Sequence, residues 1–541
     1  MMINRREFVA GLSACTATGM FAQNRSEQTA EKPNILIFMP DQQQGATVLP
    51  EHPCLTPNLD RFAREGLLFT DAYCPAPHCC PSRASFFTGL YPSEHGVFNN
   101  VDTDTAIHLE PKPGISYFSQ GLREAGYNLA YSGKWHVGHT LRPQDVGWNN
   151  VNANGHETPL PLDTDRKESR WRRPHAQFMH PEQRRPGELV RPGWGNQQMY
   201  GVRRKPLEEQ RDFQIVRDGV NALKNMAAQQ KPWCLMVSND GGHDPYDAPQ
   251  RFIDLYDPRR IQLPANFRDR MRDKPHIYQR MRLQYFDQMP DDEVKACIAH
   301  YYALLSMQDE LFGNLLQALE ATGQKENTLV IYCSDHGDYA GAHGLWAKGV
   351  PAFREAYNIP CVVRWPKGIR NPGRRVDAFV STTDFAPTIL AAAGIEAPRM
   401  SGHSLLPWFA DETPSGWRDA VFSQLNGVEL YYTQRIVLTK NFKYVYNGFD
   451  FDEMYDLTTD PLEMNNLAFP REDFPPNRNE GNASQPWPPL EPHLDKARRN
   501  LLAKMWTFAE AHQDQIFNSY FTVAMAPYGP GIVLGAERSS R

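Results

Sequence analysis

Short apolar runs alternate with helical patterns along the chain up to Gly394. Residues 33–39 form one such run, which ends at Pro40-Asp41 and is typical of a buried parallel strand. A helix is expected to open at Thr56 and stop at Gly66, and apolar side chains at three- and four-residue steps predict a longer helix. The alternation predicts an α/β fold in which helices sandwich a large, mostly parallel sheet. The other predicted strands are residues 127–131, 233–237 and 328–333, and the long helix is residues 298–321.

Polar residues follow each predicted strand at its carboxyl end. Parallel sheets gather the carboxyl ends of their strands along one edge, where doubly wound folds bind ligands. A functional site is therefore predicted at this edge. The residues concerned are Asp41, then Lys134 and His136, then His243, and finally Asp335 and His336.

The pattern changes after Gly394. Residues 420–425 and 442–446 read as antiparallel strands of a smaller C-terminal subdomain. Residues 165–205 interrupt the large domain with an excursion dense in Arg, Pro, Trp and His, and a Pro-rich tail, an amphipathic helix (494–512) and an extended end close the chain. The expected divisions are an export signal and linker (1–30), a catalytic domain (31–395), a subdomain with a small antiparallel sheet (396–470) and a tail (471–541).

The N-terminus has the features of an export signal. Arg5-Arg6 resembles a twin-arginine motif, and small apolar residues continue to Ala22. We expect export to a bacterial periplasm or the extracellular space. Leu12 to Cys15 also resembles a lipobox, which would make Cys15 a lipid anchor. Whether Cys15 is lipidated and where the signal is cleaved stay open.

Composition narrows the class of protein further. The 541 residues have a formal net charge of −6, which gives no general attraction to nucleic acid. After the N-terminus no run of eighteen apolar residues occurs, so no membrane span is predicted. The cysteines have no metal-site spacing, and the sequence does not say which of them, if any, form disulfides.

Two dipeptides provide ligands for a divalent cation. Asp41-Gln42 and Asp335-His336 together offer two carboxylates, an amide oxygen and an imidazole. Oxygen-rich sets with one imidazole suit Ca²⁺, Mg²⁺ or Mn²⁺ better than structural zinc. Either pair alone would more often be a strand-end turn, so the prediction depends on both.

Residues 79–89 read as an extended segment that turns into a helix. The segment is Cys-Cys-Pro-Ser-Arg-Ala-Ser-Phe-Phe-Thr-Gly, and Pro81 suits the first helical position. A nucleophile at such a helix start faces unpaired N–H groups and the positive end of the helix dipole, where an anion is stabilised. The alternative is a buried structural thiol at Cys79.

The same eleven residues resemble the signature of type I sulfatases, members of the alkaline phosphatase-like superfamily. The resemblance implies that Cys79 is oxidised to formylglycine (3-oxoalanine) by a formylglycine-generating enzyme. It also implies one divalent cation, most simply Ca²⁺. Its ligands by this resemblance are Asp41, Gln42, Asp335 and His336, with the oxygen of residue 79 completing the shell.

The resemblance assigns further roles around position 79. Arg83, a rigid fork of donors, would fix the hydrated aldehyde, while Lys134 would neutralise developing charge and His136 would deprotonate a hydroxyl. His243 and Lys348 would contact the sulfate and the leaving oxygen. Catalytic residues are thus Cys79, Arg83, Lys134, His136, His243 and Lys348, and substrate-binding residues are Asn100, Lys134, His243 and Lys348.

Two departures from the common sulfatase pattern bear on specificity. Many sulfatases carry Asp-Asp and Asp-Asn where this chain has Asp41-Gln42 and Asp335-His336. The observed pairs resemble the choline-sulfatase and phosphonate monoester hydrolase branch. The prediction is a sulfuric ester hydrolase acting on a sulfated small molecule or glycan, most simply a carbohydrate. The alternatives are a phosphonate or phosphate ester hydrolase with the same site, and a silent binder of sulfated glycans. The tail after Ala468 is a candidate contact between subunits of a homo-oligomer.

Overall fold

A large mixed sheet forms the centre of the computed structural model, which describes residues 32–103, 105–152, 184–191, 195–428, 430–469, 490–519 and 528–539. Its strands run in the order β12-β2-β11-β10-β1-β8-β3-β4, and every neighbouring pair is parallel except the two pairs that β11 makes. The strands are β1 (Asn34–Pro40), β2 (Leu67–Tyr73), β3 (Asn128–Gly133), β4 (Asn149–Asn150), β8 (Trp233–Asn239), β10 (Thr328–Cys333), β11 (Cys361–Arg364) and β12 (Arg374–Ser381).

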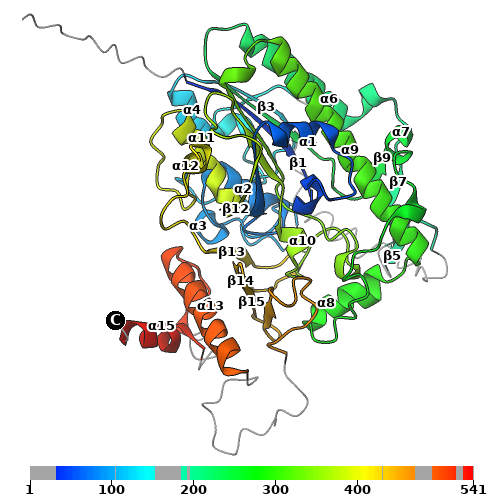
Figure 1. Ribbon diagram of the computed structural model, residues 1–541, viewed down its shortest axis with the longest axis vertical. Helices are drawn as coiled ribbons and strands as arrows, with labels where there is room; N and C mark the ends of the chain where they lie inside the picture. Colours follow the sequence, from blue (N-terminus) through cyan, green and yellow to red (C-terminus); the bar gives the residue numbers. More distant parts are fainter. Residues whose placement is uncertain are drawn as a thin grey trace, which may run out of the picture.

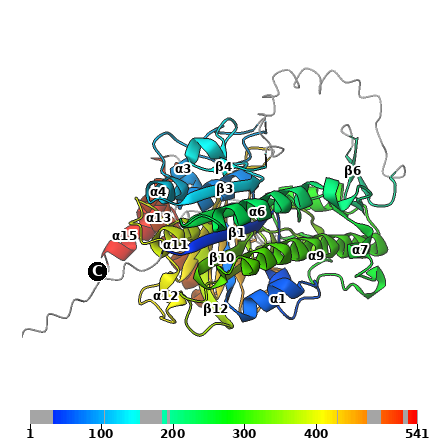
Figure 2. The same ribbon diagram turned by 90° about the horizontal axis from the view of Figure 1, so that it is seen from above.

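Helices cover both faces of this sheet, which confirms the predicted α/β sandwich (Figures 1 and 2). One layer contains α1, α6 and α9, and the other contains α2, α4 and α11. The central strands β1, β8 and β10 are buried along their whole length, as a sheet covered on both faces requires. The helices are α1 (Pro57–Arg64), α2 (Cys79–Thr88), α3 (Pro92–His95), α4 (Phe118–Glu124), α6 (Arg211–Ala227), α7 (Gln250–Ile253), α8 (His276–Arg280), α9 (Asp291–Ala321), α10 (Arg354–Tyr357), α11 (Phe385–Ala392), α12 (Leu406–Phe409), α13 (Pro492–Ala511) and α15 (Pro530–Ser539).

A second, antiparallel sheet follows the large one, in the order β13-β14-β15-β16. The two strands predicted here, 420–425 and 442–446, are not neighbours, because β14 lies between them. This sheet contacts the chain just after β2, where Gln424 N–H donates to Pro75 O at 2.7 Å. The strands are β13 (Ala420–Leu425), β14 (Gln434–Thr439), β15 (Phe442–Asn447) and β16 (Glu453–Asp456), and two short pairs elsewhere are β5 (Glu188–Arg191) with β6 (Gly195–Gln198) and β7 (Tyr200–Val202) with β9 (Tyr246–Ala248).

The C-terminal segment packs on this small sheet within the same chain. Phe508 of α13 stacks on Phe422 of β13 with ring centroids 4.2 Å apart, and Trp506 is fully buried in the same cluster. The predicted extended end is wrong for Pro530–Ser539, which form α15 against α13. Burial of Val533 and Leu534 gives this short helix the tertiary support that a sequence pattern does not reveal.

Some sequence predictions concern residues that the structure does not describe. The export signal, Cys15, most of the basic excursion and the Pro-rich part of the tail are among them. Within the described residues no helix combines the length and the apolar character that crossing a membrane requires. All eight cysteines of the described residues are free thiols.

Candidate active site

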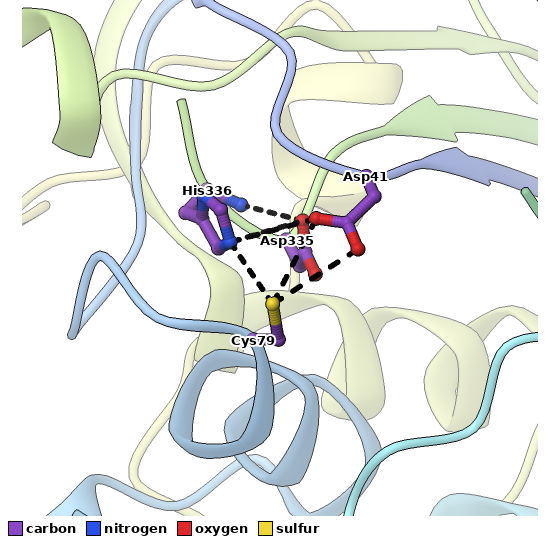
Figure 3. A group of neighbouring side chains, drawn as sticks. All are labelled: Asp41, Cys79, Asp335 and His336. Atoms are coloured by element: carbon purple, nitrogen blue, oxygen red, sulfur yellow. Dashed lines mark hydrogen bonds and ion pairs between the residues drawn. The ribbon is translucent and has the colours of Figure 1, made fainter. Parts of the chain in front are cut away.

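Four buried side chains from three elements converge at the carboxyl edge of the large sheet (Figure 3). Asp41 follows β1, Asp335 and His336 follow the neighbouring parallel strand β10, and Cys79 begins α2. One ligand atom from each of the four lies within 4.8 Å of the others. The Cys79 thiol is 3.3 Å from His336 Nε2 and 3.8 Å from Asp41 Oδ1.

The start of α2 explains how Cys79 is placed. The helix begins at Cys79, two positions before Pro81, because the chain stays extended only as far as His78. Pro81 therefore lies in the first turn, where a helix leaves N–H groups without partners and a proline costs little. Gly89, in the left-handed conformation (φ +67°), ends the helix. The thiol is held at the positive end of a fully buried helix.

Two buried cations compensate the carboxylates. Arg83 donates from Nε to Asp335 at 2.7 Å, and both side chains are completely buried. The same guanidinium donates to the Lys134 carbonyl at 3.0 Å and to Ser238 Oγ at 2.8 Å. Lys134 forms an ion pair with Asp41 and lies 3.6 Å from the Cys79 thiol. The two buried carboxylates are thus paired with buried cations.

These charges set the protonation of the cluster. Burial alone would raise the pKa of the Cys79 thiol, but Lys134 and Lys348 bring it well below the ordinary value. Burial and Cys79 would likewise raise the pKa of Asp41, yet Lys134 holds it below its usual range. Position 79 is therefore an environment that stabilises a negative charge.

The donor set fits a divalent cation. Two carboxylates and one imidazole nitrogen converge with the residue 79 side chain, and all are fully buried. Such a mainly oxygen-based set suits Ca²⁺, Mg²⁺ or Mn²⁺. The side chain of Gln42 lies beside this group: its oxygen accepts from Lys348 at 2.6 Å and its nitrogen donates to Asp338 at 2.6 Å.

The remaining predicted residues surround the same place. His243 Nε2 accepts a hydrogen bond from Lys348 Nζ at 2.8 Å, while its Nδ1 donates to the Asp244 carbonyl at 2.6 Å. Burial alone would lower the pKa of His136, but the neighbouring Cys80, Asp102 and Cys79 raise it well above the ordinary value. All six predicted catalytic residues therefore lie in one connected group.

Asn100 has a different immediate environment. Its side-chain oxygen accepts from the Cys80 N–H at 3.0 Å, and its own N–H donates to His78 Nδ1 at 3.2 Å. Asn100 thus satisfies one of the open donors at the start of α2. Burial lowers the pKa of His78 to about 3, so this neighbour of the cluster is a neutral imidazole.

Sequence reasoning missed several residues of this site. Asp338 and Asp244 both accept from the Gln42 amide, at 2.6 and 3.3 Å, and Gln197 donates to Asp244 at 2.9 Å. Asp338 stands two positions after His336 and Asp244 directly after His243, so their place beside motif residues was a usable signal. Gln197 comes from the β5–β6 hairpin, and no local pattern pointed to it. Asp102, which pairs with His136, likewise carried no motif.

Comparison with known proteins identifies the family. The sulfatase family model matches residues 33–395, and the model of the C-terminal region of N-sulphoglucosamine sulphohydrolase matches residues 341–473. A choline-sulfatase of Rhizobium meliloti is 32% identical over 467 residues, covering 81% of this chain and 83% of the relative.

Solved structures share the fold. BT4656 in complex with its substrate D-glucosamine-2-N,6-O-disulfate has a TM-score of 0.67 at 22% identity, covering 90% of this chain and 99% of its own. The phosphonate monoester hydrolase of Agrobacterium radiobacter also has a TM-score of 0.67 at 22% identity, covering 89% and 96%. The sequence matches and the alkaline phosphatase-like fold agree, and the chain belongs to the sulfatase family of sulfuric ester hydrolases.

Proposed function

We propose that the protein removes sulfate from O-sulfated carbohydrates, through a formylglycine made from Cys79 and with one divalent cation at Asp41, Gln42, Asp335 and His336. The observation that carries the proposal is the place of the Cys79 thiol, which is buried at a helix start among two carboxylates, one imidazole and Lys134. A structural thiol does not need this arrangement of charges. A residue that must become an anionic nucleophile does.

Each charged side chain has a task in such a reaction. The cation, most simply Ca²⁺, would polarise a sulfate oxygen and the hydroxyl of the hydrated aldehyde. Arg83 and Lys134 hold the carboxylates, and Lys134 is close enough to residue 79 to stabilise charge that develops on the sulfuryl oxygens. One hydroxyl of residue 79 gives its proton to the neighbouring Asp41 carboxylate and attacks sulfur, and the ester bond breaks with its electron pair on the alcohol oxygen.

Two histidines handle the protons. Lys348 and His243 share a hydrogen bond of 2.8 Å, and this pair delivers a proton to the departing alcohol oxygen. His136, which lies beside Cys80 at the start of α2, accepts the proton of the second hydroxyl as sulfate leaves and the aldehyde returns. The carbon–oxygen bond breaks by elimination, so no water has to attack a crowded anionic centre.

The carbohydrate part of the proposal is supported by the fold neighbour that was solved with a sulfated glucosamine. A second candidate has support from Gln42, a neutral amide where many sulfatases carry an acid. With less negative charge near the cation, the site would also suit a phosphonate or phosphate ester, as in the phosphonate monoester hydrolase with the same fold.

The proposed organisation of the chain accompanies this function. The catalytic domain comprises residues 31–395 and the small-sheet subdomain residues 396–470, with the tail after them. Export is proposed from Arg5-Arg6 and the apolar stretch that follows, and the lipobox-like segment Leu12 to Cys15 offers Cys15 for lipid attachment. Comparing the N-terminus of secreted and intracellular protein by mass spectrometry tests this assignment.

The test of function measures modification and turnover on one preparation. Protein coexpressed with a formylglycine-generating enzyme should show an aldehyde in the peptide that contains Cys79, and it should release sulfate from an aryl sulfate and from sulfated glucosamine. Cys79→Ser should abolish both, whereas Cys54→Ser, which removes a buried thiol elsewhere, should leave them intact. Faster cleavage of an aryl phosphonate monoester than of any sulfate ester would favour the second candidate. An unmodified thiol with no hydrolysis would favour a binding protein.

A further inference from the structure

Asp102 pairs with the histidine that the proposed reaction uses as a base. Its carboxylate oxygen lies 3.2 Å from His136 Nε2, and the two side chains are 31% and 20% exposed. Asp102 stands in the loop between α3 and α4, whereas His136 follows β3. None of the motifs that mark the site includes Asp102, and the pairing exists only in the folded chain.

The imidazole of His136 reaches the catalytic position from the same place. One ligand atom each of Cys80, Asp102 and His136 lies within 4.8 Å of the others, and Cys80 directly follows the catalytic position 79 at the start of α2. His136 also has a left-handed backbone conformation (φ +53°), which a residue with a side chain seldom adopts without a reason. The backbone turn directs the ring between Asp102 and the start of α2.

A carboxylate at Nε2 decides what the ring can do. Asp102 is acceptor-only when ionised, so the hydrogen bond requires His136 to carry its proton on Nε2. In the neutral ring Nδ1 is then the basic nitrogen. A carboxylate in this position also stabilises the imidazolium that forms when the ring takes up a proton.

We propose that Asp102 is a positioning residue, which holds His136 in the tautomer and orientation that accept a proton from the hydroxyl of residue 79. The inference rests on the proposed function, because it assigns Asp102 to one step of it. In that step a proton passes from the remaining hydroxyl of residue 79 to His136. The electron pair of that O–H bond forms the carbonyl of the aldehyde, and the carbon–oxygen bond to sulfate breaks with its pair on sulfate.

Hydrogen bonds fix the loop on both sides of Asp102. Asn99 Nδ2 donates to Thr105 O at 2.6 Å, and the Ile107 N–H donates back to Asn99 Oδ1 at 3.2 Å. Thr105 Oγ1 donates to Val428 O at 2.9 Å, in the connection between β13 and β14. The connection between β13 and β14 therefore supports the loop that carries Asp102.

The kinetic test uses Asp102→Ala and Asp102→Asn on protein with a verified aldehyde at residue 79. Asp102→Ala should lower kcat about 10²-fold with KM within about 3-fold, the scale expected when a general base loses its orientation. Because sulfate expulsion becomes slow, one equivalent of alcohol should appear in a burst, and the sulfated residue 79 peptide should accumulate in mass spectra. Asp102→Asn keeps an acceptor oxygen for His136, so its kcat should fall less than that of Asp102→Ala. Asp218→Asn, a carboxylate that bonds to Asn152 far from these residues, should match the wild type.

A second readout needs no turnover, so it separates this proposal from the proposed function. The ¹⁵N chemical shifts of His136, assigned with His136→Gln, should report a proton on Nε2 in the wild type and a mixture of tautomers in Asp102→Ala. An unchanged tautomer or an unchanged kcat in Asp102→Ala would each overturn the proposal. A fall in kcat that is fully explained by a lower melting temperature would overturn it as well. Inhibition by Zn²⁺ that Cys80→Ser abolishes would also overturn it, since the three side chains would then form a cation site. If the wild type shows the tautomer but releases no sulfate, only the proposed function fails.

Discussion

Lys348 donates a hydrogen bond of 2.6 Å to the side-chain oxygen of Gln42, although 306 positions separate the two residues in the chain. The nitrogen of the same amide donates to Asp338 at 2.6 Å, so the amide has one orientation, with its oxygen toward Lys348. A neutral side chain thereby links the proposed cation ligands to the lysine of the proposed proton-delivering pair.

Replacing Gln42 tests this link. Gln42→Ala removes the acceptor of Lys348 and one proposed cation ligand, and we expect kcat/KM and cation affinity each to fall about 10- to 100-fold. Steady-state kinetics and calorimetric titration with Ca²⁺ measure the two effects. Reduced turnover with unchanged affinity would mean that Gln42 positions Lys348 and does not bind the cation.

Removing the cation should stop the reaction without unfolding the protein. A chelator is expected to lower activity more than about 10²-fold, because no other group in the cluster can polarise the sulfate oxygens as strongly. Added Ca²⁺ should restore activity, and at 100 times its Kd it should stabilise the fold by about 2.7 kcal/mol. Full activity in the chelated protein would contradict the assignment, and calorimetry of both forms gives the stability.

Arg83 should matter for stability as well as for catalysis. Arg83→Ala leaves Asp41 and Asp335 buried without their guanidinium, and breaking such a buried pair costs about 3–5 kcal/mol. Denaturant unfolding measures this loss. Arg83→Lys keeps the charge but not the forked geometry, so it should be less destabilised yet still impaired. Arg61→Ala, on the exposed side of α1, is the control and should stay within about 0.5 kcal/mol of the wild type.

One carboxylate outside the site should make stability depend on pH. Burial raises the pKa of Asp452 to about 7, while Tyr444 and the Asn447 N–H donate to it. The pKa of Asp452 in the folded state is therefore higher than its value in the unfolded chain, about 3.9. Between these two pH values the folded protein keeps a proton on Asp452 that the unfolded chain has lost. The stabilisation is complete below about pH 4 and is lost as the pH rises through about 7.

Asp452→Asn imitates the protonated acid and should remove this dependence. Melting temperatures from pH 4 to pH 8 should decline less in the variant, and at pH 8 the variant should melt a few degrees higher than the wild type. Parallel curves for the two proteins would show that Asp452 is ionised throughout.

The contact between α13 and the small sheet should be stabilising within one chain. Phe508→Ala removes the ring that stacks on Phe422 and should cost about 3 kcal/mol in denaturant unfolding. Lys496→Ala on the same helix is the matched control. A chain that ends at Ala468 should expose the apolar face of the sheet and aggregate. The role of this tail in an oligomer stays a prediction, and light scattering of the full-length chain tests it.

Local patterns were sufficient for much of the fold. The strand at 328–333 matches β10 residue for residue, because a buried parallel strand is a short apolar run with a polar end. The helix predicted at 298–321 begins earlier, at Asp291, since its acidic first turn carries no apolar period. The sequence prediction did not include β14, which pairs with both β13 and β15. Local sequence does not show which segments pair in a sheet.

The sequence by itself determined the reaction class of this protein and the residues proposed to hold its cation: the eleven residues from Cys79, and the polar pairs that end β1 and β10. They can do so because each motif is local and the carboxyl ends of parallel strands meet at one edge. Only the tertiary structure decided which carboxylates form hydrogen bonds with His136 and Gln42. Asp102, Asp244 and Asp338 reach His136 and Gln42 from other loops, and such pairings follow from packing, which no run of neighbouring residues encodes.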